Sequence, residues 1–205
     1  MAQAQLLFIN GTSSTGKTTL ARKLQALWPT PMIYLGLDSW ITTVLAEKYW
    51  EQAVNLDQIK DDLSVKQGTH FLLPNTVDNL TPWPKIASGS VSDQAVAILH
   101  DTALAFLNKG SSVVLDGVFL SPTWRDDFLL KTAHCSRCLI QMIAPDTVLK
   151  ARERQRGDRM KDVFRSLNLI IHQGLDYDLS LDSGILSEQQ CVEKTLSWLK
   201  AHQRV

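Results

Sequence analysis

The chain has 205 residues, 44% of them hydrophobic and 20% charged, a composition that is typical of a globular domain and excludes a disordered or fibrous chain. Its 21 basic and 21 acidic residues balance, so no net charge attracts nucleic acid or an anionic membrane, and we expect neither as a partner. The three cysteines are too few for a disulfide framework, and the apolar runs are far shorter than a membrane span, which together indicate a cytoplasmic protein.

The first predicted elements enclose a phosphate-binding loop. An apolar run over residues 6–10 predicts a buried strand, and residues 17–27 predict a helix with leucines on one face. Between them, GTSSTGKT fits the pattern G-x-x-x-x-G-K-[ST], in which backbone N–H groups surround phosphates, the lysine reaches the β and γ phosphates and the last hydroxyl ligates Mg²⁺. The predicted nucleotide-binding residues are Gly11, Thr12, Ser13, Ser14, Thr15, Gly16, Lys17, Thr18 and Thr19.

A second apolar run, residues 32–36, predicts a strand that is followed by Asp38. This position lies at the carboxyl end of the strand, where ligands bind in open α/β folds. A carboxylate there could orient an acceptor hydroxyl and take its proton during phosphoryl transfer. Aspartate is also a favoured helix cap, so Asp38 could instead cap the segment that begins SWITTVL. We expect the catalytic role.

Residues 46–89 form a long insert that is polar and weakly periodic, with several aromatic residues and prolines. An insert of this length in a compact domain is typical of a lid or a substrate-binding subdomain. The alternative is a surface excursion that packs its own aromatic side chains. The aromatic residues that could line an acceptor pocket are Trp40, Trp50, Phe71 and Trp83.

Residues 92–109 predict a helix, and residues 112–117 predict a third strand that carries Asp116 near its end. A carboxylate at the end of a central strand is the Walker-B position, which holds Mg²⁺ or its water shell. An isolated aspartate after an apolar run is often only a turn residue. With the phosphate-binding loop upstream, we predict a metal site made by Thr18 and Asp116.

The fourth predicted strand, residues 138–145, is preceded by the stretch HCSRC. Cys135 and Cys138 have the spacing of half a zinc site, but such a site needs four ligands, and Cys191 stands far away in a helical segment. We therefore predict no metal or redox role for the cysteines.

The segment 150–165, KARERQRGDRMKDVFR, carries seven basic and three acidic residues. Its arginines Arg152, Arg156 and Arg159 recur at helical spacing and would share one face. An arginine-bearing lid brings guanidinium groups to the transferred phosphate when it closes. The alternative is a solvated face with weak ion pairs. We predict the lid, with these three arginines and Lys17 in catalytic roles.

The chain closes with a weaker strand at residues 177–182 and a helix through Leu199 that begins at the capping box SEQQ. His172 ends an apolar run and is given no chemical role. Strands that alternate with helices predict a single α/β domain over residues 1–205, with a five-stranded parallel sheet.

Five stretches together resemble the chloramphenicol phosphotransferase family of small P-loop kinases, in order and at comparable spacing: GTSSTGKT, GLDSW, VVLDGVF, ARERQRGDR and IIHQGLDYDLSLD. The resemblance implies the fold of nucleoside monophosphate kinases, ATP and Mg²⁺ as cofactors, and a small molecule with a hydroxyl group as the acceptor. It also implies that Asp38 is the catalytic base and that Arg152, Arg156 and Arg159 are lid arginines.

The chain departs from the family where the acceptor would bind. It has no arginine between Arg22 and Arg125, and Gly117 stands where the family typically has a second acidic residue. The acceptor and the oligomeric state therefore stay open. The alternatives are a nucleotide-sugar kinase of toxin type and a nucleotide-dependent switch or binding protein.

Overall fold

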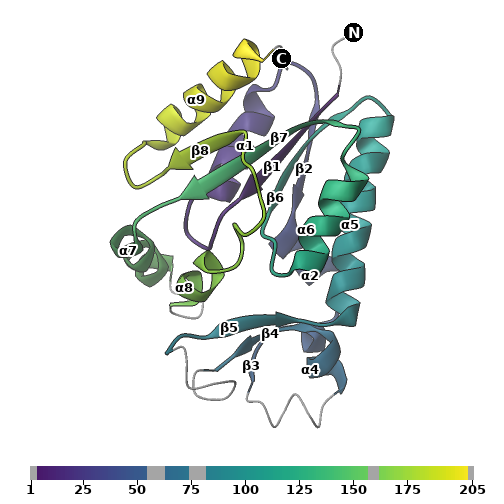
Figure 1. Ribbon diagram of the computed structural model, residues 1–205, viewed down its shortest axis with the longest axis vertical. Helices are drawn as coiled ribbons and strands as arrows, with labels where there is room; N and C mark the ends of the chain where they lie inside the picture. The colour runs from purple at the N-terminus through teal and green to yellow at the C-terminus, as the bar shows by residue number, and fades with distance from the viewer. Residues whose placement is uncertain (1–3, 55–62, 74–81, 157–161, 203–205) are drawn as a thin grey trace.

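The computed structural model describes residues 4–54, 63–73, 82–156 and 162–202. Its centre is a five-stranded sheet in the order β2-β6-β1-β7-β8, and every neighbouring pair of strands is parallel (Figure 1). The strands are β1 Gln5–Asn10, β2 Met32–Gly36, β6 Ser112–Gly117, β7 Ser136–Ile143 and β8 Leu179–Asp182. The predicted five-stranded parallel sheet is confirmed, and its strand positions are close to those expected from the sequence.

The two faces of the sheet carry separate hydrophobic cores, because successive side chains of a strand point to opposite faces. In β1, Leu7 and Ile9 belong to one core, whereas Leu6 and Phe8 belong to the other. All four side chains are buried, which explains why β1 is a nearly continuous apolar run rather than an alternating one.

Helices cover both faces of the central sheet (Figure 1). One face is covered by α1 Lys17–Leu27 and α9 Glu188–Ala201, and the other by α2 Leu37–Val44, α5 Ser90–Asn108 and α6 Pro122–Lys131. The capping box predicted at the start of α9 is present, since Ser187 Oγ accepts from the Gln190 backbone N–H and the Gln190 side chain accepts from the Ser187 N–H. None of the helices in the described ranges is both long and apolar enough to span a bilayer.

The three cysteines are free thiols. Cys138 and Cys191 are buried in the core beneath α1 and α9, and Cys135 lies at the turn before β7. Among the described residues, no group of three potential metal ligands includes them.

The insert forms a second, smaller sheet, which the sequence analysis did not predict. Its described elements are η1 Glu47–Tyr49, β3 Trp50–Val54, α4 Leu63–Gln67, β4 Thr69–Leu72 and β5 Lys85–Ser88. Strands β3 and β4 are parallel, and β4 and β5 are antiparallel. Figure 1 shows this sheet at the end of the molecule where α2 and α8 lie.

The second sheet is attached to the main body through α8 Val163–Asn168. Its Phe71 and Ile86 pack against Leu167 and neighbouring apolar residues of α8 and the turn that follows. The Ser166 hydroxyl donates a hydrogen bond to the Pro84 carbonyl oxygen at 2.6 Å. The predicted lid, residues 150–165, corresponds to the end of α7 Asp146–Arg156 and the start of α8, and its residues 157–161 lie outside the described ranges.

Candidate active site

The phosphate-binding loop connects β1 to α1 in a tight turn around the end of the sheet. Ser14 (φ 65°) and Gly16 (φ 93°) adopt the left-handed conformation, and Gly16 caps the N-terminus of α1. A Cβ atom at Gly11 would overlap the carbonyl oxygen of Met142 on β7, so only glycine fits there. The first residues of α1 line the cavity, and the backbone N–H groups in the first turn of a helix have no partner within the helix.

The side chains of this loop divide into two groups. Thr15 Oγ1 donates to the Thr12 carbonyl oxygen at 2.9 Å, and Thr12 Oγ1 donates to the Phe164 carbonyl oxygen at 3.3 Å. Both threonine side chains therefore stabilise the conformation of the loop. Ser13 and Ser14 line the cavity, and among the described residues their buried hydroxyls have no hydrogen-bond partner. Unsatisfied hydroxyl donors next to an ammonium group are what a bound phosphate requires.

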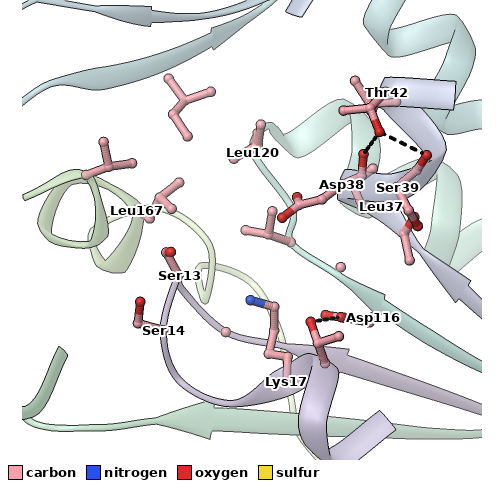
Figure 2. A pocket seen from close by; sticks show the side chains of 18 of the residues that line it. Ser13, Ser14, Lys17, Leu37, Asp38, Ser39, Thr42, Asp116, Leu120 and Leu167 are labelled. Atoms are coloured by element: carbon pink, nitrogen blue, oxygen red, sulfur yellow. Dashed lines mark hydrogen bonds between the residues drawn. The ribbon is translucent and has the colours of Figure 1, made fainter. Parts of the chain in front are cut away.

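Lys17 projects its ammonium group into the same cavity, opposite Asp38 (Figure 2). Its Nζ donates a hydrogen bond to the Thr12 carbonyl oxygen at 3.0 Å. The loop therefore presents a positive charge beside the two serine hydroxyls, as the sequence pattern requires for a nucleotide triphosphate.

Thr18 and Asp116 meet because β1 and β6 are adjacent parallel strands and Ile9 pairs with Asp116 in their register. Thr18 Oγ1 donates to Asp116 Oδ2 at 2.5 Å. Hydroxyl and carboxylate oxygens are the ligand types that Mg²⁺ accepts, directly or through water. The two residues predicted as metal ligands are thus together at the floor of the cavity.

Tyr34 is a third member of this cluster and was not identified from the sequence. Its hydroxyl donates to Asp116 Oδ2 at 3.2 Å, and the guanidinium group of Arg22 lies over its ring at 3.5 Å from the centroid. Burial, followed by the adjacent Asp116 charge, raises the pKa of Tyr34 to about 12, so the hydroxyl stays a hydrogen-bond donor at neutral pH. A Cβ at residue 36 would overlap this hydroxyl, which accounts for Gly36.

Asp38 lies in the first turn of α2 and points its carboxylate into the cavity (Figure 2). The N-cap of α2 is Gly36, and no side chain caps this helix. The alternative interpretation of Asp38 as a helix cap is therefore wrong. The carboxylate instead faces Lys17 across the cavity, at the carboxyl edge of the sheet.

The three predicted lid arginines have different positions. Arg152 donates to the Ser14 carbonyl oxygen at 3.1 Å and to Ser183 Oγ and O at 2.9 and 2.8 Å, which fastens α7 to the back of the phosphate-binding loop. Arg156 lines the cavity from the end of α7. Arg159 lies outside the described residues. The site roles of these arginines remain predictions.

A buried polar chain supports the loop at Asn10, the last residue of β1. Asn10 Nδ2 donates to the Tyr177 hydroxyl at 2.6 Å and to the Ile171 carbonyl oxygen at 2.8 Å. Because the Tyr177 oxygen accepts this bond, its own proton can point to His172 Nδ1, 2.7 Å away. Burial lowers the pKa of His172, which agrees with a neutral imidazole that accepts at Nδ1, and burial raises the pKa of Tyr177 to about 12.

These hydrogen bonds join residues up to 167 positions apart in the sequence, so no local sequence pattern could have revealed them. The only sequence feature at these positions was the H-x-G-x-x-Y-D portion of the family resemblance. Its Asp178 side chain accepts a hydrogen bond from the Leu139 N–H at 2.7 Å, which places the stretch against β7. The structure gives these residues a supporting position next to the phosphate-binding loop.

One cavity of about 470 Å³ contains the phosphate-binding loop, Asp38 and Asp116. This volume lies within the range of about 300–1,000 Å³ that is common for small-molecule sites. Of the four aromatic residues proposed for its wall, Trp50 and Phe71 line it. Trp40 instead donates its Nε1–H to the Ala95 carbonyl oxygen, and Trp83 lies under Arg165, so neither belongs to the described lining.

Residues 4–200 match the family described as chloramphenicol phosphotransferase-like protein. A relative found in two strains of Mycobacterium tuberculosis, under the provisional name O-phosphotransferase, is 25% identical over 194 residues, which cover 89% of this chain and 76% of the relative.

Solved structures of kinases share the fold. A sugar kinase from Janibacter sp. HTCC2649 superposes with a TM-score of 0.62 at 18% identity, covering 96% of this chain and 95% of that one. APS kinase of M. tuberculosis, in complex with AMPPNP and APS, gives 0.60 at 12% identity with 98% and 99% coverage. A gluconokinase from Sinorhizobium meliloti 1021 gives 0.60 at 13% identity with 98% and 95% coverage.

At these identities the solved structures establish the fold alone, which is that of P-loop kinases. The family match covers nearly the whole chain, including the phosphate-binding loop and both carboxylates of the cavity. The chain therefore belongs to the chloramphenicol phosphotransferase-like family.

Proposed function

We propose that this protein transfers the γ-phosphate of ATP to a hydroxyl group of a small molecule. The observation that carries the proposal is the arrangement of the cavity: Lys17 and Asp38 face each other across it (Figure 2), and residues of the second sheet, among them Phe71 and Ile86, line it as well. A phosphate donor and a hydroxyl acceptor could bind there in line, which is the geometry that phosphoryl transfer needs.

The donor half is the phosphate-binding loop. Ser13, Ser14 and the backbone N–H groups at the start of α1 bind the phosphate oxygens, and Lys17 neutralises charge on the β and γ phosphates. Thr18 and Asp116 would hold Mg²⁺, which neutralises phosphate charge when it is bound. Arg156 lines the cavity at the end of the predicted lid and would add a second cation beside the transferred group.

The acceptor half centres on Asp38. Its carboxylate accepts a hydrogen bond from the acceptor hydroxyl and orients the oxygen toward the γ-phosphorus. As the new O–P bond forms, the hydroxyl proton passes to Asp38 and the bond from the γ-phosphorus to the β,γ-bridging oxygen breaks, which leaves ADP.

The test is acceptor-dependent release of ADP. Purified protein is given ATP, Mg²⁺ and a panel of hydroxyl compounds that includes phenicols, sugars and aminoglycosides, and products are searched by mass spectrometry for one added phosphate. We expect at least one alcohol to accelerate ADP release and to gain phosphate. ATP turnover that no member of the panel accelerates would favour a nucleotide-dependent switch instead.

The role of Asp38 is tested by Asp38→Asn. Loss of a general base typically lowers the rate about 10²- to 10⁴-fold, and we expect a fall in kcat of that order while binding of ATP is kept. Thr43→Ala, on the exposed side of the same helix, is the matched control and should leave both values near wild type. Full activity of Asp38→Asn would remove Asp38 from the base role.

A further inference from the structure

Arg22 lies on α1 four residues after Thr18, so the two side chains project from the same face of the helix. Both residues line the cavity. Arg22 is exposed, and an exposed arginine usually samples many side-chain conformations. Two contacts hold its guanidinium group, however, and both lead to β2.

The first contact runs through Gln25. Arg22 Nη1 donates a hydrogen bond to Gln25 Oε1 at 3.1 Å. The Nε2 of the same Gln25 side chain donates to the Met32 carbonyl oxygen at 3.0 Å, at the start of β2. Arg22 is thereby connected to the strand that carries Tyr34, two residues after Met32.

The second contact is with Tyr34 itself. The centre of the guanidinium group lies 3.5 Å from the centroid of the Tyr34 ring, well inside the range of about 6 Å for a cation–π contact. At the other end of the ring, the hydroxyl lies against Gly36, where a Cβ atom would overlap it. Contacts at the ring face and at the hydroxyl end therefore fix the direction in which this hydroxyl points.

The Tyr34 hydroxyl points to the predicted metal site. It donates to Asp116 Oδ2 at 3.2 Å, and Thr18 Oγ1 donates to the same oxygen. Two donors on one oxygen favour a single orientation of the carboxylate, and the affinity of a metal site depends on such partners of its ligands. Arg22 contacts this carboxylate indirectly, through the Tyr34 ring.

The charge of Arg22 acts in the opposite direction to its position. A cation near a metal site repels Mg²⁺, so by charge alone the loss of Arg22 would strengthen Mg²⁺ binding. By position, the loss of Arg22 would free the Tyr34 ring and weaken Mg²⁺ binding. Because the two effects have opposite signs, the change in Mg²⁺ affinity on substitution of Arg22 tells them apart.

We propose that Arg22 is a positioning residue for the metal site: its stacked guanidinium group holds the Tyr34 hydroxyl on Asp116 and thereby raises the affinity for Mg²⁺ in the presence of nucleotide. This inference rests on the proposed function, in which Thr18 and Asp116 hold Mg²⁺. It adds to the donor half of the site a residue that the phosphate-binding pattern does not contain.

The experiment measures binding of AMPPNP to the full chain by calorimetry, at a series of free Mg²⁺ concentrations and with EDTA in place of Mg²⁺. The quantity compared is the Mg²⁺ concentration that gives half of the full gain in AMPPNP affinity, so the result does not depend on turnover. We expect Arg22→Met to raise this concentration about threefold, which is the size of effect that a cation–π contact at an exposed site supports. The AMPPNP affinity in EDTA should stay near wild type.

Two further variants separate position from charge. Lys23→Met removes the same charge from the next residue of α1, which pairs with Glu188 and lies outside the described cavity lining, and it should leave the Mg²⁺ requirement unchanged. The double variant of Arg22→Met with Tyr34→Phe should need the same Mg²⁺ concentration as Tyr34→Phe alone, because the hydroxyl on which Arg22 acts is then absent. Thermal melts verify that each variant is folded, and Arg22→Met alone decides the matter if the double variant is not.

An unchanged or lowered Mg²⁺ requirement of Arg22→Met overturns the inference. A further shift caused by Arg22→Met in the Tyr34→Phe background overturns it as well, because Arg22 would then act without the Tyr34 hydroxyl. A loss of AMPPNP affinity in EDTA has the same consequence, since it would mean that Arg22 contacts the nucleotide directly.

Phosphorylation of the alcohol panel is measured separately on the same preparations. If Arg22→Met raises the Mg²⁺ requirement while no alcohol gains phosphate, the positioning role stands and the proposed function fails. If an alcohol is phosphorylated but Arg22→Met has the Mg²⁺ requirement of the wild type, only the positioning role fails. A wild-type protein whose AMPPNP affinity does not respond to Mg²⁺ contradicts both.

Discussion

At Asp116 of β6, side chains from a helix and a neighbouring strand meet. Thr18 in the first turn of α1 and Tyr34 on β2 both donate hydrogen bonds to its Oδ2. Thr18 and Asp116 were predictable, because each belongs to a local motif. Tyr34 was not, since a tyrosine inside a strand carries no local sign that its hydroxyl will reach a carboxylate 82 residues away.

The Tyr34 hydroxyl gives a prediction about Mg²⁺. Partners that orient a metal ligand commonly change metal affinity about 10- to 100-fold when they are removed. We therefore expect Tyr34→Phe to raise the Mg²⁺ concentration for half-maximal phosphoryl transfer about tenfold, with the KM for the acceptor unchanged. The measurement is a Mg²⁺ titration of ADP release at fixed ATP. Tyr49→Phe, outside the cavity lining, serves as control, and an unshifted titration of Tyr34→Phe would exclude the orienting role.

Among the helices and strands, those with a clear local sequence pattern could be predicted. The central strands are apolar runs bounded by turn residues, and the final helix has a capping box, so their positions followed from periodicity and end signals. The strands of the insert have only four or five residues and lie in a polar segment. Alternation of apolar and polar residues along them is therefore too short to recognise in the sequence. Their pairing is stabilised partly by contacts with α8, roughly 80 to 100 residues later, which a local pattern does not contain.

The capping box at Ser187 should be worth measurable stability. Replacing a serine N-cap by alanine costs about 1 kcal/mol, which corresponds to a fall in Tm of about 2–4 °C for a chain of this length. We expect that fall for Ser187→Ala in a thermal melt, with unchanged kinetics at 25 °C. Ser180→Ala removes an exposed serine hydroxyl from the edge strand β8 and should shift Tm less. Equal shifts in Tm for the two variants would mean that the N-cap adds no more stability than an exposed serine on β8.

At the scale of the whole molecule, α8 connects the two halves of the cavity. On one side, the carbonyl oxygen of its Phe164 accepts a hydrogen bond from Thr12 of the phosphate-binding loop. On the other side, its Leu167 packs with Phe71 of the second sheet, and Ser166 binds the Pro84 carbonyl. A helix of six residues thereby contacts both the phosphate-binding loop and the second sheet.

Because α8 contacts both sides of the cavity, we expect two core mutations with similar loss of stability to differ in their effect on acceptor binding. Leu167→Ala and Leu199→Ala each remove a buried leucine side chain, 4% and 0% exposed, and each should lower the free energy of unfolding by about 2–5 kcal/mol. Leu167 holds the second sheet, whereas Leu199 lies on α9 in the core of the opposite face. We therefore expect only Leu167→Ala to raise the acceptor KM several-fold, while the KM for ATP stays near wild type in both variants.

Urea unfolding gives the stabilities, and initial rates with an alcohol that the wild type phosphorylates give the two KM values. If Leu199→Ala raised the acceptor KM as much as Leu167→Ala, the effect would follow from lost stability in general. A selective effect of Leu167→Ala would mean that acceptor binding depends on Leu167 itself, which lines the cavity and packs against the second sheet, and not on stability in general.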